Sequence, residues 1–264
     1  MATTAHPAFE KACSYLDVKC NQIECESVYG LPDMKAYEKK INKNTIMLVG
    51  SAPNLAFGTV DPLDQIGELA GKYNTGFFLD GCMGSLLLPF IDDFGVKTGQ
   101  KYCDLRNKNV TGMSCDVHKY GMVPKGLSVL MFPRKEIKLA LHWCTPSWVG
   151  GLYATPNIQG SRPSHTIAAG WSVMIYHGYS EYARIAKKIF DATDLLVTEV
   201  KKIPELRIVG NPRLGNVTMT SKDPKFNIHT LGGFLNDKGW FLNSGQRPNT
   251  VYCTIHEKNS ENIP

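Results

Sequence analysis

The first part of the chain alternates between strand-like and helix-like patterns of apolar residues. Asp33 is placed to cap a short helix, and residues 45–51, TIMLVGS, form an apolar run typical of a buried strand. Asp61 and Pro62 then predict an N-cap and a first helical residue, followed by apolar positions at helical spacing. A second apolar strand is predicted at residues 76–79. This strand–helix–strand order predicts an α/β fold with a mostly parallel sheet, whose ligands lie beyond the carboxyl ends of the strands.

The second part of the chain changes pattern. Residues 166–200 have helical periodicity, with a break expected at the GYS turn of residues 178–180. Shorter elements follow Pro204: strands at residues 206–209, 217–220 and 250–256, and a helix at residues 228–235. We therefore predict a large domain over residues 1–200 and a smaller α+β domain over residues 201–264.

Composition narrows the possible functions. With 264 residues, 43% of them hydrophobic and 20% charged, the chain can bury a core large enough for an active site. The formal charge of +5 is mild and no Lys/Arg block occurs, so we expect no nucleic-acid partner and favour an anionic ligand. The eight cysteines contain no C-x-x-C pair, which predicts reduced thiols in a cytosolic-facing protein and no metal site. No apolar run is long enough to predict a membrane span in this chain.

Two residues at strand ends could carry chemistry. Asp80 ends the apolar strand GFFLDGCMG, where a carboxylate is costly unless a cation meets it, although an Asp in this position often only caps a turn. Lys119, in SCDVHKYGMVPKG, lies in a turn before the apolar run of residues 127–132, which we expect to be a buried strand. Partial burial there would lower the pKa of the amine and free it as a nucleophile, whereas most lysines are surface charges.

Together these two residues suit pyridoxal 5'-phosphate. This cofactor requires a lysine for its Schiff base and an acidic partner for its pyridine nitrogen. Asp80 and Lys119 are separated by 119 − 80 = 39 residues and both belong to strand-flanked turns. The sequence therefore predicts a pyridoxal-phosphate site at the carboxyl end of the sheet.

Five ordered segments carry a family resemblance: HPAFEKA, SAPNLAFGTVDP, LDGCMGS, SCDVHKYGMVPKG and SWVGGLYATPNIQGSRPS. In order and spacing they resemble the sphingosine-1-phosphate lyases, fold-type I pyridoxal-phosphate enzymes close to the group II decarboxylases. The resemblance implies a fold-type I transferase-like large domain and a homodimeric enzyme. It also implies retro-aldol cleavage of sphingoid base 1-phosphates, such as sphingosine 1-phosphate and dihydrosphingosine 1-phosphate, to a fatty aldehyde and phosphoethanolamine. Full-length members are expected at the endoplasmic reticulum membrane, through an anchor that this chain does not show.

The resemblance also implies roles for individual residues. Lys119 matches the Schiff-base lysine, and Asp80 matches the partner of the pyridine nitrogen. His6 matches the histidine that stacks on the cofactor ring, and His118 matches the histidine beside the cofactor phosphate. Each of these assignments depends on the match between its segment and the family pattern.

Two further positions leave alternatives open. Lys125 matches a second family lysine that holds the substrate phosphate or assists proton transfer, but an exposed surface lysine is equally compatible with its position. Arg162, in GSRP, is either a structural residue or a contact to the phosphate of the substrate.

The chain also departs from the family pattern. In family members a long segment precedes the stacking histidine and supplies a Gly/Ser/Thr-rich turn for the cofactor phosphate, but only five residues precede His6 here. Ala52 stands where Thr is usual, and Gly81 and Ser85 replace the common Ala and Gly. We therefore expect a truncated form or short isoform that binds the cofactor weakly alone. A group II amino-acid decarboxylase, or an inactive fragment that works only with a longer subunit, remains an alternative.

Overall fold

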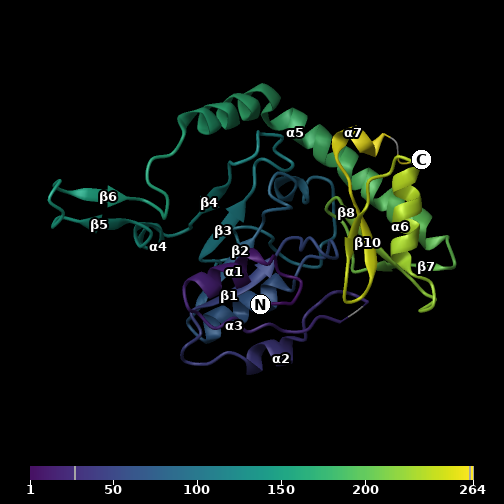
Figure 1. Ribbon diagram of the computed structural model, residues 1–264, viewed down its shortest axis with the longest axis horizontal. Helices are drawn as coiled ribbons and strands as arrows, with labels where there is room; N and C mark the ends of the chain where they lie inside the picture. Colours follow the sequence, from purple (N-terminus) through teal and green to yellow (C-terminus); the bar gives the residue numbers. More distant parts are fainter. Residues whose placement is uncertain (27, 262, 264) are drawn as a thin grey trace.

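Three parts of the fold are visible in Figure 1: a parallel sheet near the N-terminus, a projecting hairpin, and a C-terminal sheet joined to the first by a long helix. The structure is a computed structural model and describes residues 1–26, 28–261 and 263. The elements of the first part are α1 (Ala8–Tyr15), α2 (Met34–Lys39), β1 (Met47–Ser51), α3 (Leu63–Lys72), β2 (Gly76–Asp80), the 3-10 helix η1 (Leu88–Phe90), β3 (Gly112–Cys115) and β4 (Val129–Met131). The remaining elements are α4 (Lys135–Leu139), β5 (Trp143–Thr145), β6 (Tyr153–Thr155), α5 (Ser164–Lys201), β7 (Leu206–Val209), β8 (Asn216–Ser221), α6 (Ile228–Asp237), β9 (Asn243–Gly245), β10 (Thr250–Thr254) and α7 (Glu257–Ser260).

The N-terminal sheet has the strand order β1-β2-β3-β4. Strands β1, β2 and β3 run parallel, and β4 is antiparallel to β3. The register places Asp80 of β2 opposite Ser51 of β1 on one side and Ser114 of β3 on the other. Because parallel strands end at the same edge, the backbone delivers these three polar residues to one place, as the strand–helix–strand pattern predicts.

Strand β4 differs from the sequence-based expectation. A buried strand was expected at residues 127–132, but Val129 is 40% and Leu130 is 54% exposed. In the described sheet β4 is an edge strand that pairs only with β3, so one of its sides has no neighbouring strand to cover it. The apolar run correctly indicates a strand and wrongly indicates its burial.

Asp61 does not cap a helix, although the sequence predicts that it does, and is the second place at which the structure differs from the expectation. The cap position of α3 is Pro62, and no side chain caps this helix. The Asp61 carboxylate instead accepts hydrogen bonds from the backbone N–H of Ser51, at 2.8 Å, and from the side-chain amide of Asn54, at 3.3 Å. Asp61 is fully buried, so its side chain fixes the end of β1 to the loop that follows. Asp33, by contrast, caps α2 as expected by accepting from the N–H of Lys35.

Helix α5 contains the break that the sequence predicts. Gly178 has φ +63°, a left-handed conformation that favours glycine, and the helix changes direction there. Nearly all the buried residues of α5 follow this kink, among them Ile185, Ile189 and Phe190, which belong to the main hydrophobic core. The kink therefore separates a well-packed second half from a more exposed first half.

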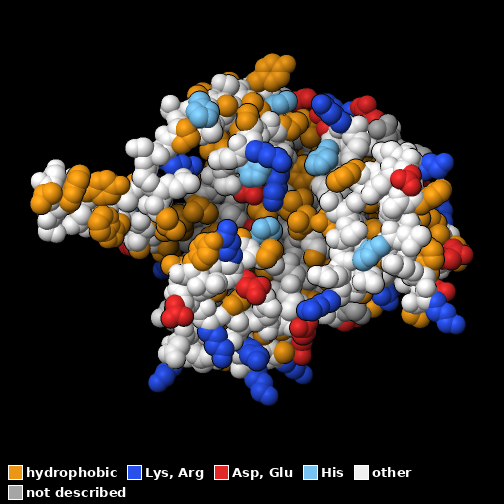
Figure 2. Space-filling model, viewed as in Figure 1, with side chains coloured by type: hydrophobic (Ala, Val, Ile, Leu, Met, Phe, Trp, Pro, Cys, Tyr) orange, Lys and Arg blue, Asp and Glu red, His pale blue; other side chains and the backbone are white. Residues whose placement is uncertain are grey.

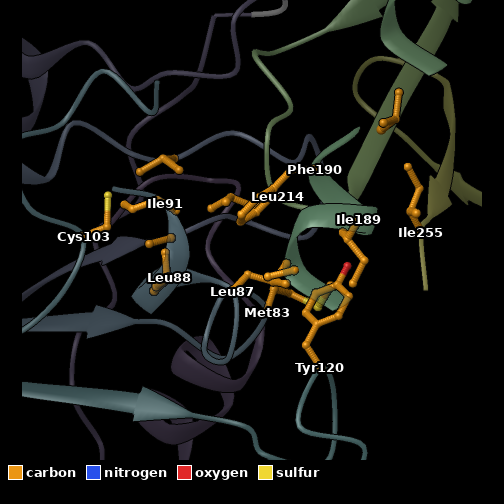
Figure 3. Packing of buried hydrophobic residues seen from close by; sticks show 14 of the residues in the cluster. Met83, Leu87, Leu88, Ile91, Cys103, Tyr120, Ile189, Phe190, Leu214 and Ile255 are labelled. Atoms are coloured by element: carbon orange, nitrogen blue, oxygen red, sulfur yellow. The ribbon is translucent and has the colours of Figure 1, made fainter. Parts of the chain in front are cut away.

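The C-terminal sheet is antiparallel with the order β7-β8-β10-β9, and α6 packs against β10. The strands and the helix expected beyond Pro204 are confirmed. One core joins both sheets: Figure 3 shows Met83 and Leu87, from the turn after β2, near Ile189 of α5, with Leu214 from the segment before β8 close by. The division between residues 200 and 201 stays a prediction, because this core is continuous across it.

A projecting arm, residues 133–163, extends from the rest of the fold (Figure 1). It contains α4 and the hairpin of β5 and β6, and none of its residues is buried. Val149 and Ile158 are completely exposed and Trp148 is 56% exposed. The arm thus presents apolar side chains that the described chain does not cover. No helix among the described residues combines the length and the apolar character needed to cross a membrane.

Candidate active site

Asp80 lies where the register of the sheet places it, at the carboxyl end of β2 with only 5% of its surface exposed. Its Oδ1 atom accepts a hydrogen bond from the Ser114 hydroxyl at 2.8 Å and from the Cys82 backbone N–H at 3.1 Å. Its own carbonyl accepts from the N–H of Ala52 at 2.9 Å. A carboxylate at this depth needs such donors, so the position and orientation of Asp80 are well determined.

The turn after Asp80 is held close to β1 by glycine. A Cβ on Gly84 would lie 2.1 Å from the carbonyl oxygen of Ala52, so a larger residue would push the turn away. Gly81 is also constrained, since a Cβ there would lie 2.8 Å from the carbonyl oxygen of Ser114. This crowding is a physical reason for glycine at position 81, one of the departures from the family pattern. The turn returns the side chain of Cys82 toward β3 and the segment after it.

Lys119 lies in the turn that follows β3. Its backbone N–H donates to the carbonyl of Asp116 at 3.0 Å, and its own carbonyl accepts from Met122 at 3.0 Å. Its Nζ atom donates to the Cys82 Sγ atom at 3.2 Å and lies 3.3 Å from Oδ2 of Asp116. Because Cys82 also donates its N–H to Asp80, this one residue connects the two sequence-predicted groups.

The pKa values in this cluster correct one expectation. Burial opposes the charged amine of Lys119, but the Cys82 sulfur that accepts its hydrogen bond and the Asp116 carboxylate outweigh burial and raise the pKa of Lys119 above its ordinary value. The lowered pKa expected from partial burial is therefore wrong for the chain as described. Burial also raises the pKa of the Cys82 thiol to about 12, and the nearby Asp80 carboxylate contributes to the shift. The thiol is consequently protonated at neutral pH.

His118 and Asp116 complete the turn. The Nδ1 atom of His118 lies 2.8 Å from the carbonyl oxygen of Leu127, and Nε2 lies 3.7 Å from Oδ2 of Asp116. The other carboxylate oxygen of Asp116 accepts a hydrogen bond from the Ser128 hydroxyl. Asp116 thus faces both His118 and Lys119. Sequence reasoning missed this residue, although its position three residues before Lys119 in the same turn could have indicated it.

The other three sequence-predicted residues lie in more open positions. His6 is exposed at the start of α1, where its Nδ1 accepts from the N–H of Ala8 at 3.2 Å. Lys125 and Arg162 are exposed, the latter at the end of the arm. Within the described residues, no hydrogen bond or ion pair joins these three side chains to Asp80 or Lys119. Their roles remain predictions.

Helix α1 is nevertheless fixed to the strand that ends in Asp80. The ring of Phe9 contacts the ring of Phe78 edge-on, with 5.8 Å between centroids. In Figure 2 histidine, basic and acidic side chains gather near the middle of the visible face, in the region that Figure 1 shows between the N-terminal layer and the C-terminal sheet.

Asp61 is a second buried carboxylate near this cluster. Burial raises its pKa to about 7, with a smaller contribution from the charge of Asp80, although the hydrogen bonds from Ser51 and Asn54 oppose the shift. Sequence reasoning assigned Asp61 a helix cap and did not expect a buried titratable group there. Asp61 supports the site structurally, because its carboxylate binds the N–H of Ser51, the residue that faces Asp80 across the β1–β2 ladder.

The residues present fit the ring of pyridoxal 5'-phosphate. A carboxylate fixed by two donors suits a protonated pyridine nitrogen. Cys82, whose N–H donates to this carboxylate, accepts a hydrogen bond from the Lys119 amine with its sulfur, so the lysine is connected to the carboxylate through one residue. Two open cavities of about 640 and 830 Å³ lie elsewhere, and neither is lined by Asp80 or Lys119. The fit to the cofactor therefore rests on the chemistry of Asp80, Cys82 and Lys119 and not on the shape of a cavity.

Comparison with known families decides the relationship. The sequence profile described as the pyridoxal-dependent decarboxylase conserved domain matches residues 1–222. The chain belongs to the pyridoxal-dependent decarboxylase family. The expected cofactor is thus the one for which this family is named.

Within that family the chain is similar to curated sphingosine-1-phosphate lyases. It is 36% identical over 257 residues to the lyase of Dictyostelium discoideum, covering 97% of this chain and 47% of that protein. It is 37% identical over 253 residues to the lyase of Saccharomyces cerevisiae, covering 96% of this chain and 42% of that protein. The resemblance read from the five sequence segments is confirmed, and the chain spans somewhat less than half the length of these relatives.

Solved structures of this pyridoxal-dependent group confirm the fold-type I architecture. The sphingosine-1-phosphate lyase of Burkholderia pseudomallei superimposes with a TM-score of 0.93 at 32% identity, covering 98% of this chain and 58% of that one. The glutamate decarboxylase of Lactobacillus brevis superimposes with a TM-score of 0.82 at 18% identity, which shows a shared fold alone. The α/β fold class predicted from the sequence is therefore correct.

Proposed function

We propose that this chain carries the catalytic centre of a pyridoxal-phosphate-dependent carbon–carbon lyase that cleaves sphingoid base 1-phosphates. The observation that carries the proposal is the cluster in which Cys82 contacts both Asp80 and Lys119 at the carboxyl end of β2. The substrate class rests on the relatives, which are named sphingosine-1-phosphate lyases. The products would be a fatty aldehyde and phosphoethanolamine.

Four residues would hold the cofactor. Asp80 would accept a charge-assisted hydrogen bond from the pyridine nitrogen, and Lys119 would form the Schiff base. His6 would stack on the ring, and His118 would lie beside the phosphate. When bound, the cofactor supplies an electron sink for the pair released as the Cα–Cβ bond of the substrate breaks.

The chain's own groups would control the proton at the Lys119 amine. Asp116 lies 3.3 Å from Nζ and stabilises the ammonium form, so it keeps a proton on the amine until the lysine reacts. Cys82 stays protonated at neutral pH and adds no negative charge beside Asp80. This division leaves Asp80 as the carboxylate that faces the ring and Asp116 as the carboxylate that faces the lysine.

Two exposed basic residues could serve the substrate phosphate. Lys125 lies six residues after Lys119 in the same connection, and Arg162 lies at the end of the arm. An arginine suits a phosphate because its planar guanidinium donates two parallel hydrogen bonds. We assign Arg162 to the substrate phosphate and leave Lys125 as a second contact to it or an aid to proton transfer.

We also propose that the complete enzyme is a homodimer in which the arm contacts a second copy. The arm's completely exposed Val149 and Ile158 would lie in water in an isolated chain, which is unfavourable for contiguous apolar surface. The eight cysteines are all free, and the cytosolic-facing position expected from their spacing is part of the proposal. Association of full-length members with the endoplasmic reticulum membrane remains an expectation from the resemblance.

The direct test is an assay of aldehyde release from a sphingoid base 1-phosphate in the presence of pyridoxal 5'-phosphate. We expect activity that Lys119→Ala abolishes and that Asp80→Asn lowers by about 10²–10³-fold, since the amide keeps the acceptor for Ser114 and Cys82 but loses the charge. Release of carbon dioxide from glutamate or aromatic amino acids without aldehyde formation would contradict the proposal.

A second assay tests whether this chain, which spans less than half the length of its curated relatives, works together with a longer subunit. The chain is mixed with the yeast lyase whose Schiff-base lysine has been replaced, so that only Lys119 can support turnover. Activity in the mixture alone would show that the centre works with a longer subunit, the alternative noted from the sequence. Full turnover of the chain by itself at a low concentration of pyridoxal 5'-phosphate would contradict the expected weak cofactor binding, whereas turnover that needs an excess of the cofactor agrees with it.

A further inference from the structure

A groove of about 830 Å³ is lined in part by Thr59, Val60 and Pro62, from the loop that connects β1 to α3. One wall is the segment before α2, in which the carbonyl of Val28 accepts from the N–H of Gly210, the residue that follows β7, at 2.6 Å. The hydroxyl of Thr59 donates to the carbonyl of Tyr29 at 3.2 Å and completes the connection. Figure 1 shows this segment running past the lower end of the C-terminal sheet before it reaches α2. We call this cavity the basic groove.

Positive charge is concentrated in the basic groove. Its charged lining residues are Asp194, Lys201, Arg207, Arg213 and Lys222. Four cations against one carboxylate give 4 − 1 = +3, while the whole chain has a formal charge of only +5. The groove therefore holds a large share of the net charge and forms a local field that attracts anions.

Two arginines in the groove retain hydrogen-bond donors. Arg213 donates from one terminal nitrogen to Asp194 at 2.8 Å and keeps its other terminal N–H groups. The Nε atoms of Arg207 and Arg213 are both buried beneath the surface and have no hydrogen-bond partner among the described residues. A ligand in the groove does not reach these two buried atoms, but an oxygen-rich anion would accept from the other guanidinium N–H groups of the two residues, which line the groove. Guanidinium groups match the oxygens of a phosphate in geometry and charge.

The segment before α2 lines the groove with apolar side chains. Tyr29 is 57% exposed and Leu31 is 36% exposed, and both line the groove beside Pro62. An inorganic anion would use the arginines and leave this wall uncovered. A ligand with a phosphate at one end and an apolar part at the other would use both walls.

We propose that the basic groove binds a phosphate ester with an apolar part, with the phosphate on Arg207 and Arg213 and the apolar part against Tyr29 and Leu31. This site goes beyond the proposed function, because Asp80 and Lys119 do not line the groove. The ligand is either a soluble ester or the headgroup of a phosphorylated membrane lipid, two sources with the same chemistry.

Calorimetric titration with hexyl phosphate and with inorganic phosphate tests the soluble source. We expect hexyl phosphate to bind more tightly than inorganic phosphate. Arg207→Gln and Arg213→Gln should each weaken its binding about tenfold or more, as charge-assisted hydrogen bonds are lost. Leu31→Ser should weaken hexyl phosphate and leave inorganic phosphate unchanged. Lys43→Gln, which removes an exposed charge outside the groove, is the matched control.

Sedimentation with phosphatidylcholine vesicles, with and without phosphatidic acid, tests the lipid source. Binding to phosphatidic acid that Arg207→Gln abolishes assigns the groove to a lipid headgroup, and binding of hexyl phosphate alone assigns it to a soluble ester. Binding of neither probe, or binding that survives both arginine substitutions in variants whose circular dichroism matches the wild type, overturns the proposal. Because no step of this test uses lyase activity or pyridoxal phosphate, its failure is separate from a failure of the proposed function.

Discussion

The centre around Asp80 and Lys119 and the arm of residues 133–163 differ in the burial and the hydrogen bonding of their side chains. Asp80 is 5% exposed and is held by a hydroxyl and a backbone N–H, and Lys119 contacts a thiol and a carboxylate. In the arm no residue is buried, and Arg162 is exposed. The chain by itself therefore determines the geometry of the centre and leaves that of the arm open.

The difference indicates which functional groups depend on this chain alone. The cofactor-facing groups are positioned by a parallel sheet whose register brings Ser51, Asp80 and Ser114 together. The arm's contacts are internal, such as the edge-on packing of Trp148 on Tyr153 at 6.1 Å. We infer that the centre keeps its geometry in isolation, whereas the arm acquires its own from a second copy of the chain.

The largest expected effect is covalent labelling by the cofactor at Lys119 and at no other lysine. After incubation with pyridoxal 5'-phosphate and reduction with borohydride, mass spectrometry should locate the cofactor on Lys119. Lys119→Ala should abolish this labelling, because its amine alone is held by Asp116 and Cys82 beside Asp80. Lys125→Ala, six residues away and exposed, is the matched control and should keep it.

Labelling that moves to Lys125 in the Lys119→Ala variant would contradict this assignment. Loss of labelling in both variants would show that the connection between β3 and β4 has lost its structure. Circular dichroism of the two variants distinguishes that case from a true loss of the amine.

Cysteine reactivity compares the two regions within one sample. Burial raises the pKa of Cys82 to about 12, so its thiolate is scarce at pH 8, whereas Cys144 lies exposed on β5 in the arm. We expect iodoacetamide to modify Cys144 about a hundredfold faster than Cys82, as followed by mass spectrometry of the two peptides. Raising the pH from 8 to 9 should increase the rate at Cys82 close to tenfold, since the thiolate fraction rises tenfold per pH unit well below the pKa. Equal rates at the two cysteines would mean that the centre is open to solvent.

The sequence predicts those parts of the fold that local patterns specify. Strands β1, β2, β8 and β10 have apolar runs or alternation, and the break at Gly178 follows from a glycine before a turn. Strand β3, with the sequence GMSC, was missed because Gly and Ser have weak strand preference and its pairing with β2 and β4 stabilises it. Burial of β4 and the role of Asp61 were wrong because both depend on which elements lie beside them.

The same distinction applies to the site. Asp80 and Lys119 could be found because each lies at a strand end or in a turn, positions that a single chain reveals. Cys82 could not be found in this way, since its importance lies in a contact to Lys119, which is 37 residues away in the sequence. Asp116 was overlooked, although it lies three residues before Lys119 in the same turn. Such contacts follow from register and turn geometry, which apolar periodicity does not report.

Stability should also divide between the two regions. Leu79, adjacent to Asp80, has no exposed surface, so Leu79→Ala should lower the free energy of unfolding by about 2–5 kcal/mol. Ile158 of the arm is completely exposed, and Ile158→Ala should change the same quantity by less than about 0.5 kcal/mol. Urea denaturation followed by circular dichroism measures both. A large loss at Ile158 would show that the arm packs within one chain and would remove the basis of the comparison.

The smallest expected effect concerns contact between copies. If the arm packs on a second chain, replacing Val149 and Ile158 together by Ser removes apolar surface that the partner would cover. At roughly 1 kcal/mol for each side chain, self-association should weaken about tenfold or more, as measured by sedimentation velocity over a concentration series. Ile46→Ser is the matched control, because Ile46 is 67% exposed but lies before β1, outside the arm. An association constant that falls in the control and not in the arm variant would place the interface at the edge of the N-terminal sheet.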